Sequence, residues 1–156
     1  RRGIALFYAE RFEEAADQFE SYHSFDQVDR ENGIWRYLSQ YRAFGRNKAR
    51  EGLLKYKKDD REPFPSVYKL FAGSTTVAEI LDGITAAEIS KPEREMRQFY
   101  AQLYIGLNFA VEGNERLARD HLALATQNSR GPAAGYGPNY MWHVARLHYE
   151  RLAEKK

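Results

Sequence analysis

Two distant stretches of the chain repeat one spacing of small and apolar residues. After a first glycine, the matching positions follow three, twelve, sixteen and nineteen residues later in both stretches. They are Gly3, Leu6, Ala15, Phe19 and Tyr22 in the first stretch, and Gly106, Phe109, Ala118, Leu122 and Ala125 in the second. Glu10-Arg11 and Gly113-Asn114 provide a turn at the same place in each. The spacing predicts two amphipathic helices joined by a tight turn, with the glycine admitting close approach of the partner helix.

The remaining apolar residues also follow helical spacing between turn residues. We expect helices over residues 31–44, 48–56, 66–71, 93–111, 115–127 and 139–154, and one more that Thr75 or Thr76 caps and that ends at Ile84. A glycine- and proline-rich connector is expected over 131–138. The alternation of β-branched residues typical of strands is missing. The prediction is an all-α, tetratricopeptide-like (TPR-like) α-α superhelix of about four antiparallel helix hairpins plus a C-terminal capping helix. One domain is expected to cover residues 1–156.

Size and composition restrict the possible classes of function. The chain has 156 residues, of which 43% are hydrophobic and 29% charged, which is globular composition. It contains no cysteine, so disulfides, thiolate metal sites and cysteine nucleophiles are excluded. No apolar run approaches the roughly 18 to 20 residues that span a bilayer. Because the sequence starts at Arg1 without Met and Gly3 is expected inside a helix, we expect a longer parent chain whose compartment is left unassigned.

Several segments resemble a known family. The two spaced hairpins and the turn Gly113-Asn114 resemble tetratricopeptide repeats. The segments that resemble a bacterial and plastid family of TPR-like proteins are residues 2–8, 11–15 and 18–20, Glu31-Asn32 with Trp35, Asp60-Arg61 before Pro63, residues 100–107, and Tyr140-Met141 with residues 144–146 and His148. The layout is more loosely similar to NlpI-type bacterial lipoproteins, which are repeat adaptors. The resemblance implies a helical-repeat fold and a binding role, and it supplies no catalytic motif.

Residues that could carry chemistry are few and poorly spaced. His143 and His148 are five residues apart, whereas zinc-binding pairs on a helix are usually four apart. Glu13-Glu14 fits the first turn of a helix, where the helix dipole favours negative charge. The glycines of residues 131–137 lack the Lys-Ser/Thr of a phosphate-binding loop. We therefore predict no catalytic residues, no metal site, no cofactor and no enzymatic activity.

Charge is distributed unevenly along the chain, although the net charge is only +2. Between residues 10 and 31 there are eight acidic residues and two arginines, and between 42 and 61 eight basic and three acidic ones. The basic stretch could contact nucleic acid, but a solvated helix face is the more ordinary interpretation. The opposed stretches could also steer a protein partner or pair two copies of the chain, so a homodimer is possible.

The predicted function is that of a protein–protein interaction module, an adaptor or scaffold binding a peptide or helix of a partner protein. The side chains predicted to face the partner are Tyr8, Arg36, Gln40, Tyr100, Trp142, Arg146 and Tyr149, because Tyr, Trp and Arg are favoured at interfaces. Ile4, Phe7, Leu103 and Leu107 lie on the same stripe, and we expect them in the core. The alternative is a small-ligand binder or enzyme that uses a cleft near the C-terminal helix.

Overall fold

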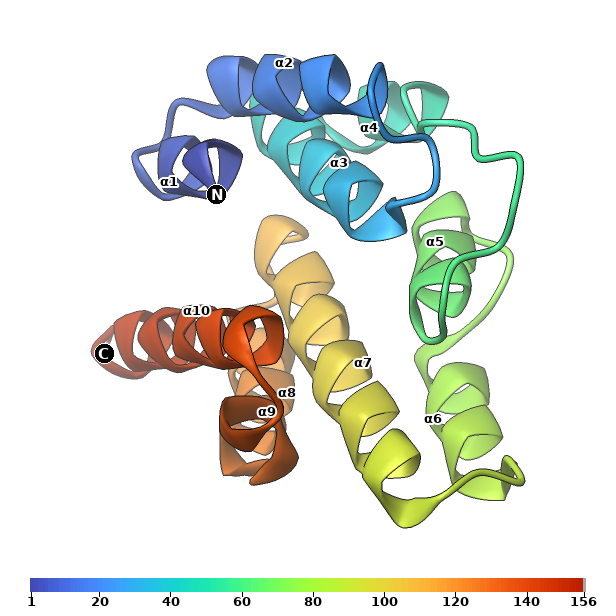
Figure 1. Cartoon of the computed structure of the whole chain (residues 1–156). Helices are drawn as coiled ribbons and strands as arrows, with labels where there is room; N and C mark the ends of the chain where they lie inside the picture. The colour runs from blue at the N-terminus through green and yellow to red at the C-terminus, as the bar shows by residue number, and fades with distance from the viewer. Residues whose placement is uncertain (156) are drawn as a thin grey trace. The chain divides into compact units, whose positions relative to one another are not determined.

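The computed structural model describes residues 1–155, and all regular structure in these residues is helical (Figure 1). The ten helices are α1 (Arg2–Tyr8), α2 (Phe12–His23), α3 (Arg30–Phe44), α4 (Arg46–Glu51), α5 (Phe64–Ala72), α6 (Val77–Ala86), α7 (Lys91–Val111), α8 (Glu115–Gln127), α9 (Arg130–Ala133) and α10 (Tyr136–Ala153). This confirms the all-α class. The chain divides into two compact units, Arg1–Thr75 and Thr76–Lys156.

The first unit is built around α3. Helix α2 packs along one side of α3, while α4 and α5 pack against other parts of it, and α1 forms a hairpin with α2. Trp35 lies at the centre of an aromatic cluster, with ring centroids 5.4 Å from Phe7 and 6.4 Å from Phe19. On α3, Tyr37 stacks on Phe71 of α5 at 4.3 Å. Aromatic side chains therefore fill the seams between these helices.

The second unit is built around α7, the longest helix. Helices α6, α8 and α9 pack against α7, and α10 packs on α8 and α9. The buried face of α7 carries Phe99, Leu103, Tyr104 and Leu107, which are almost inaccessible to solvent. No helix in the described part of the chain is both long enough and apolar enough to cross a membrane.

The hairpins α1–α2 and α7–α8 close with the same backbone hydrogen bonds. In the first, the amides of Glu10 and Arg11 donate to the carbonyls of Phe7 (3.0 Å) and Leu6 (2.9 Å). In the second, the amides of Gly113 and Asn114 donate to the carbonyls of Ala110 (3.1 Å) and Phe109 (2.9 Å), at the same offsets. Both turns place one residue in the left-handed region, Glu10 at φ 62° and Gly113 at φ 83°. These are the bonds of a Schellman motif, which satisfies the last carbonyls of a helix.

The repeated glycines lie where the two helices of each hairpin come closest. A Cβ atom on Gly3 would lie 2.5 Å from Cζ of Phe19, and one on Gly106 would lie 2.8 Å from Cγ of Leu122. Both distances are shorter than van der Waals contact, so only glycine fits without a shift. Ala15 and Ala118, at the crossing, have no exposed surface. These contacts and the matching turns confirm the predicted duplication of a helix pair.

The predicted helix ends at residues 44, 111, 115 and 127 are confirmed, and capping residues define several of the helix ends. Helix α3 ends at Gly45, whose φ is 91°, and α5 ends at Gly73, whose φ is 81°. The side chain of Thr76 accepts from the Glu79 amide at the start of α6. The side chain of Asn114 does the same for α8. These residues provide either a positive φ or a side-chain oxygen for an unpaired amide.

The prediction of a helix over 48–56 is wrong beyond residue 51. Helix α4 ends at Glu51, and the chain then returns along α3 without helical structure as far as Pro63. The carbonyl of Gly52 accepts from the guanidinium of Arg36, and that of Leu54 accepts from the Tyr68 hydroxyl at 2.9 Å. Side chains of α3 and α5 therefore donate to carbonyls that would accept from backbone amides if the helix continued.

The connector predicted over 131–138 is also wrong in part. Residues 130–133 form the single turn α9, and α10 begins at Tyr136. Gly131 is buried, and a Cβ there would lie 3.0 Å from Cδ1 of Phe99, so this turn is packed on α7. Pro138 lies in the first turn of α10, where a missing amide hydrogen costs nothing.

Candidate functional site

Three of the predicted partner-facing residues lie in the first unit. Arg36 is buried, and its guanidinium donates to the Gly52 carbonyl and forms an ion pair with Glu20 at 3.3 Å. Gln40 is half-buried, with Oε1 at 3.5 Å from Arg36. Tyr8 is half-buried, with its ring 6.2 Å from that of Trp35. Arg36 therefore joins α3 to α2 and to the end of α4.

The other four lie in the second unit, and three of them share one stripe of α10. Trp142, Arg146 and Tyr149 are all half-buried and follow one another at four and three residues, the spacing of one helix face. The indole Nε1 of Trp142 donates to the carbonyl of Thr126 on α8 at 3.0 Å. Arg146 forms an ion pair with Glu150 at 2.9 Å. The structure therefore brings these three side chains together.

Tyr100 does not belong to this half-buried set. It is buried on α7, and its ring stacks on that of Tyr104 with centroids 6.3 Å apart. The four apolar residues expected in the core are buried, which confirms that interpretation for Ile4, Phe7, Leu103 and Leu107.

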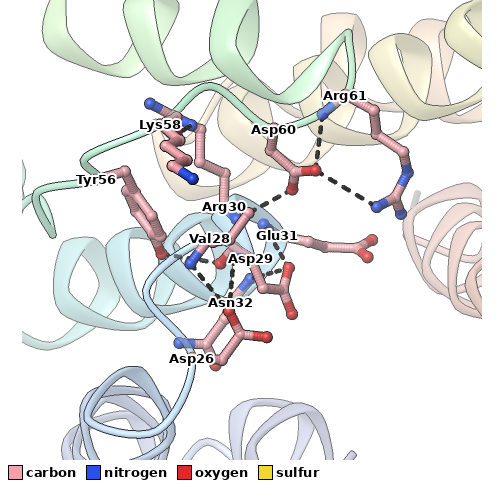
Figure 2. A network of polar contacts seen from close by, with 10 residues as sticks. All are labelled: Asp26, Val28, Asp29, Arg30, Glu31, Asn32, Tyr56, Lys58, Asp60 and Arg61. Carbon is pink, nitrogen blue, oxygen red and sulfur yellow. Dashed lines mark hydrogen bonds and ion pairs between the residues drawn. The ribbon is translucent and has the colours of Figure 1, made fainter.

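A polar network that sequence reasoning missed surrounds the start of α3 (Figure 2). The carboxylate of Asp29 accepts from the amides of Glu31 (3.0 Å) and Asn32 (3.3 Å), which caps the helix. The Arg30 guanidinium donates to the Lys58 carbonyl at 2.6 Å and to the Asp59 carboxylate at 3.1 Å. Its cationic group also lies 4.9 Å from the ring centroid of Tyr56. The network ties the returning segment, residues 52–63, to α3.

Two tyrosines, Tyr56 and Tyr68, also belong to this network. The Tyr56 hydroxyl donates to the Asp29 carbonyl at 2.9 Å, and the Tyr56 and Tyr68 rings meet edge to face at 5.5 Å. Both hydroxyls lie against Gly33, where a Cβ would be 2.5 Å and 2.7 Å from the two oxygens. Burial raises the pKa of both tyrosines well above the ordinary value. They therefore remain neutral hydrogen-bond donors near neutral pH.

Asp29 is a partly buried carboxyl group of this network with a raised pKa. Burial raises its pKa, while the Asn32 amide opposes that shift, and the neighbouring Asp26 and Asp60 carboxylates add to it. Asp60 accepts from the Arg30 amide at 3.3 Å and from the Arg61 amide at 2.7 Å. Most hydrogen bonds of this network therefore join a side chain to the backbone of the first unit. The arrangement holds α3 in place and presents no activated nucleophile.

One sequence signal did indicate this region. Glu31-Asn32 with Trp35, and Asp60-Arg61, were among the segments of the family resemblance. The buried Asn32 side chain donates to the Phe19 carbonyl at 2.8 Å, which links α3 to α2. Arg30 and Tyr56 could not be found in this way, because Arg30 donates to the Lys58 carbonyl and Tyr56 to the Asp29 carbonyl, and both contacts join residues that are far apart in the sequence.

The histidines are dispersed over the described residues. His121 Nδ1 lies 2.6 Å from the side-chain oxygen of Gln102, and burial lowers the pKa of His121. His143 lies 3.5 Å from the Arg146 guanidinium. Among residues 1–155, no group of three or more His, Asp or Glu side chains is placed to hold a metal ion.

Comparisons with known proteins do not assign this chain to a family. No family model matches it, and no curated protein matches it either. The TPR-like resemblance therefore rests on the residues and on the duplicated hairpins.

Proposed function

We propose that this protein is a TPR-like interaction module that binds a peptide or helix of a partner protein. The observation that carries the proposal is the α10 stripe, defined as Trp142, Arg146 and Tyr149. Its members combine partial exposure with side chains of the types enriched at interface hot spots. The hydrogen bond from Trp142 to Thr126 holds the indole in place, so binding would cost little side-chain entropy.

The duplicated hairpins support the same proposal from the scaffold. Helix pairs with a glycine–apolar contact at one seam are the units from which helical-repeat proteins build rigid binding surfaces. In this chain both copies use the same turn and the same close contact. The α10 stripe lies beside the buried face of its helix, formed by Met141, Val144, Ala145 and Leu152. Such a position is typical of a surface that is fixed by packing and still open to a ligand.

A pair of charge-reversal variants tests the proposal. Arg146→Glu changes the α10 stripe, whereas Arg151→Glu makes the same charge change at an exposed position on another face of the helix. The immobilised wild-type chain and the Arg151→Glu variant should recover the same partner from cell extract, and Arg146→Glu should lose it. Circular dichroism should show the same helix content for both variants as for the wild-type chain. Equal recovery by the two variants, or no specific partner with any of them, would contradict the proposal.

A further inference from the structure

Helix α10 carries a second row of large side chains, on a different face from the α10 stripe. Tyr136, Tyr140, His143 and Leu147 follow one another at four, three and four residues, so they share one face of the helix. At about 100° per residue, this face lies about 130° from the buried face of α10 and about 120° from the α10 stripe. These four residues define the outer row.

The outer row is open to solvent at the end of a stack of helices. Tyr136 and Leu147 are 75% and 56% exposed, His143 is exposed and Tyr140 is half-buried. In the second unit α8 packs against α7, and α10 packs against α8, so α10 is the last helix of this stack. Stacked helical repeats need a polar outer face at their ends, because an apolar end favours the addition of a further helix. The outer row therefore has the character of a surface that another helix covers.

The spacing of the outer row indicates which helix fits. Large side chains at alternating spacings of four and three residues form the seam of a helix pair, in which the side chains of one helix fit between those of the other. From Tyr136 to Leu147 the seam is about 17 Å long, at about 1.5 Å per residue. Because α10 itself carries this spacing, a second α10 supplies a matching seam.

The charges along α10 select the direction of that second helix. Residues 136–145 contain no Asp, Glu, Lys or Arg, whereas residues 146–155 contain both arginines that flank Leu147, namely Arg146 and Arg151. In a parallel helix pair, Arg146 of one copy would face Arg151 of the other across the seam, as like charges. An antiparallel pair places each charged half beside the uncharged half of the other helix, and it avoids that repulsion.

We infer that two copies of this chain associate through their outer rows, with the two α10 helices antiparallel about a two-fold axis. A two-fold pair uses the same surface on both copies. A seam of one helix from each copy is smaller than the roughly 800 Å² per partner of an ordinary stable interface, so the dimer forms at high protein concentration. The α10 stripe stays outside this contact, and the inference therefore goes beyond the proposed function.

The antiparallel arrangement gives the outer row suitable neighbours. Leu147 lies beside His143 of the second copy, and Tyr140 lies beside Glu150 of the second copy. Glu150 accepts from Arg146 of its own chain at 2.9 Å, yet its side chain is 50% exposed. Since a carboxylate accepts several hydrogen bonds, Glu150 can also accept from the tyrosine hydroxyl.

Sedimentation velocity tests the association. The wild-type chain should shift from monomer towards dimer between about 10 µM and about 1 mM. Leu147→Lys places a charge in the seam and Tyr136→Ser removes its first ring, so each should weaken dimerisation at least tenfold. Val28→Lys is the matched control, because Val28 is 47% exposed, lies outside α10 and receives the same charge. Circular dichroism should show the wild-type helix content in all three variants.

A nitroxide label tests the direction of the helices. The chain contains no cysteine, so Glu154→Cys provides a single site for attachment. In a mixture of the nitroxide-labelled chain with an unlabelled ¹⁵N chain, the label should broaden the amide signals around Tyr136 of the ¹⁵N chain. Broadening around Glu154 of the ¹⁵N chain would show a parallel pair and overturn the inference.

Two results of the sedimentation experiment would also overturn the inference. These are a wild-type chain that stays monomeric at about 1 mM, and equal dimerisation of Leu147→Lys and Val28→Lys. Leu147→Lys leaves the α10 stripe intact and should still recover the partner that Arg146→Glu loses. A monomeric wild-type chain that recovers this partner would contradict the dimer alone, and a dimer without any such partner would contradict the proposed function alone.

Discussion

Replacing Gly106 by alanine tests the contact on which the repeated hairpin depends. The new Cβ would lie 2.8 Å from Cγ and 3.2 Å from the backbone nitrogen of Leu122. Overpacking of this kind costs about 1–3 kcal/mol, because a backbone atom cannot move aside. Alanine in place of glycine inside a helix returns about 1 kcal/mol. The net expectation is a destabilisation of about 0–2 kcal/mol.

Gly83→Ala is the matched control, because Gly83 is exposed within α6 and a Cβ there would meet nothing within 4 Å. It should stabilise the protein by about 1 kcal/mol. The helix-propensity gain is common to both variants, so their difference of about 1–3 kcal/mol measures the packing contact alone. Urea denaturation should show a lower midpoint for Gly106→Ala than for Gly83→Ala, with equal slopes. Equal midpoints would refute the close contact between α7 and α8.

Three further predictions concern the turn and the α3 network. Because Glu10 has φ 62°, Glu10→Gly should raise the free energy of unfolding by about 1 kcal/mol, and Gly113→Ala should lower it by a similar amount, both measured by urea denaturation. Burial raises the pKa of Asp29, so the folded protein holds this proton more tightly than the unfolded chain does. The resulting stability is present below about pH 4 and is lost as pH rises through the raised pKa; Asp29→Asn, which keeps the helix cap, should abolish that loss in denaturation curves across pH. Tyr56→Phe removes the hydrogen bond to the Asp29 carbonyl and should lower the melting temperature, at a cost of about 1 kcal/mol.

The parts of the fold that could be predicted are those that local rules determine. Gly45 and Thr76 fix helix boundaries through a positive φ and a side-chain cap, and the helix predicted over 31–44 ends where Gly45 follows it. The repeated spacing identified Gly3 and Gly106 as close contacts because a helix seam leaves a periodic pattern. These features depend on a few neighbouring residues, so the sequence displays them.

The returning segment could not be predicted, because its structure depends on distant side chains. Leu53, Leu54 and Tyr56 have the spacing of a helix face, but the chain there follows hydrogen bonds from Tyr68 and from Arg36. Arg36 was predicted to face a partner, and the structure buries it. Its burial follows from the Gly52 carbonyl and Glu20, which local periodicity does not reveal.

The α10 stripe was found from sequence because its three members share one helix face. Trp142, Arg146 and Tyr149 lie beside the apolar positions of α10, and that offset can be read from 3.6-residue periodicity. The exposed Phe25 lies in the loop between α2 and α3, where the backbone hydrogen-bonds to the Asp26 carboxylate and carries no periodic signal. Surfaces on helices were therefore accessible to prediction, whereas the exposed loop was not.

The most direct test of the duplicated hairpin is a nuclear Overhauser experiment on the two glycines. The close contacts predict strong cross-peaks from the Gly3 α-protons to the Phe19 ring, and from the Gly106 α-protons to the Leu122 methyl groups. Both sets should appear in the same sample. Cross-peaks from these glycines to water alone, or from only one of the two, would contradict the claim that the two stretches fold into the same helix pair.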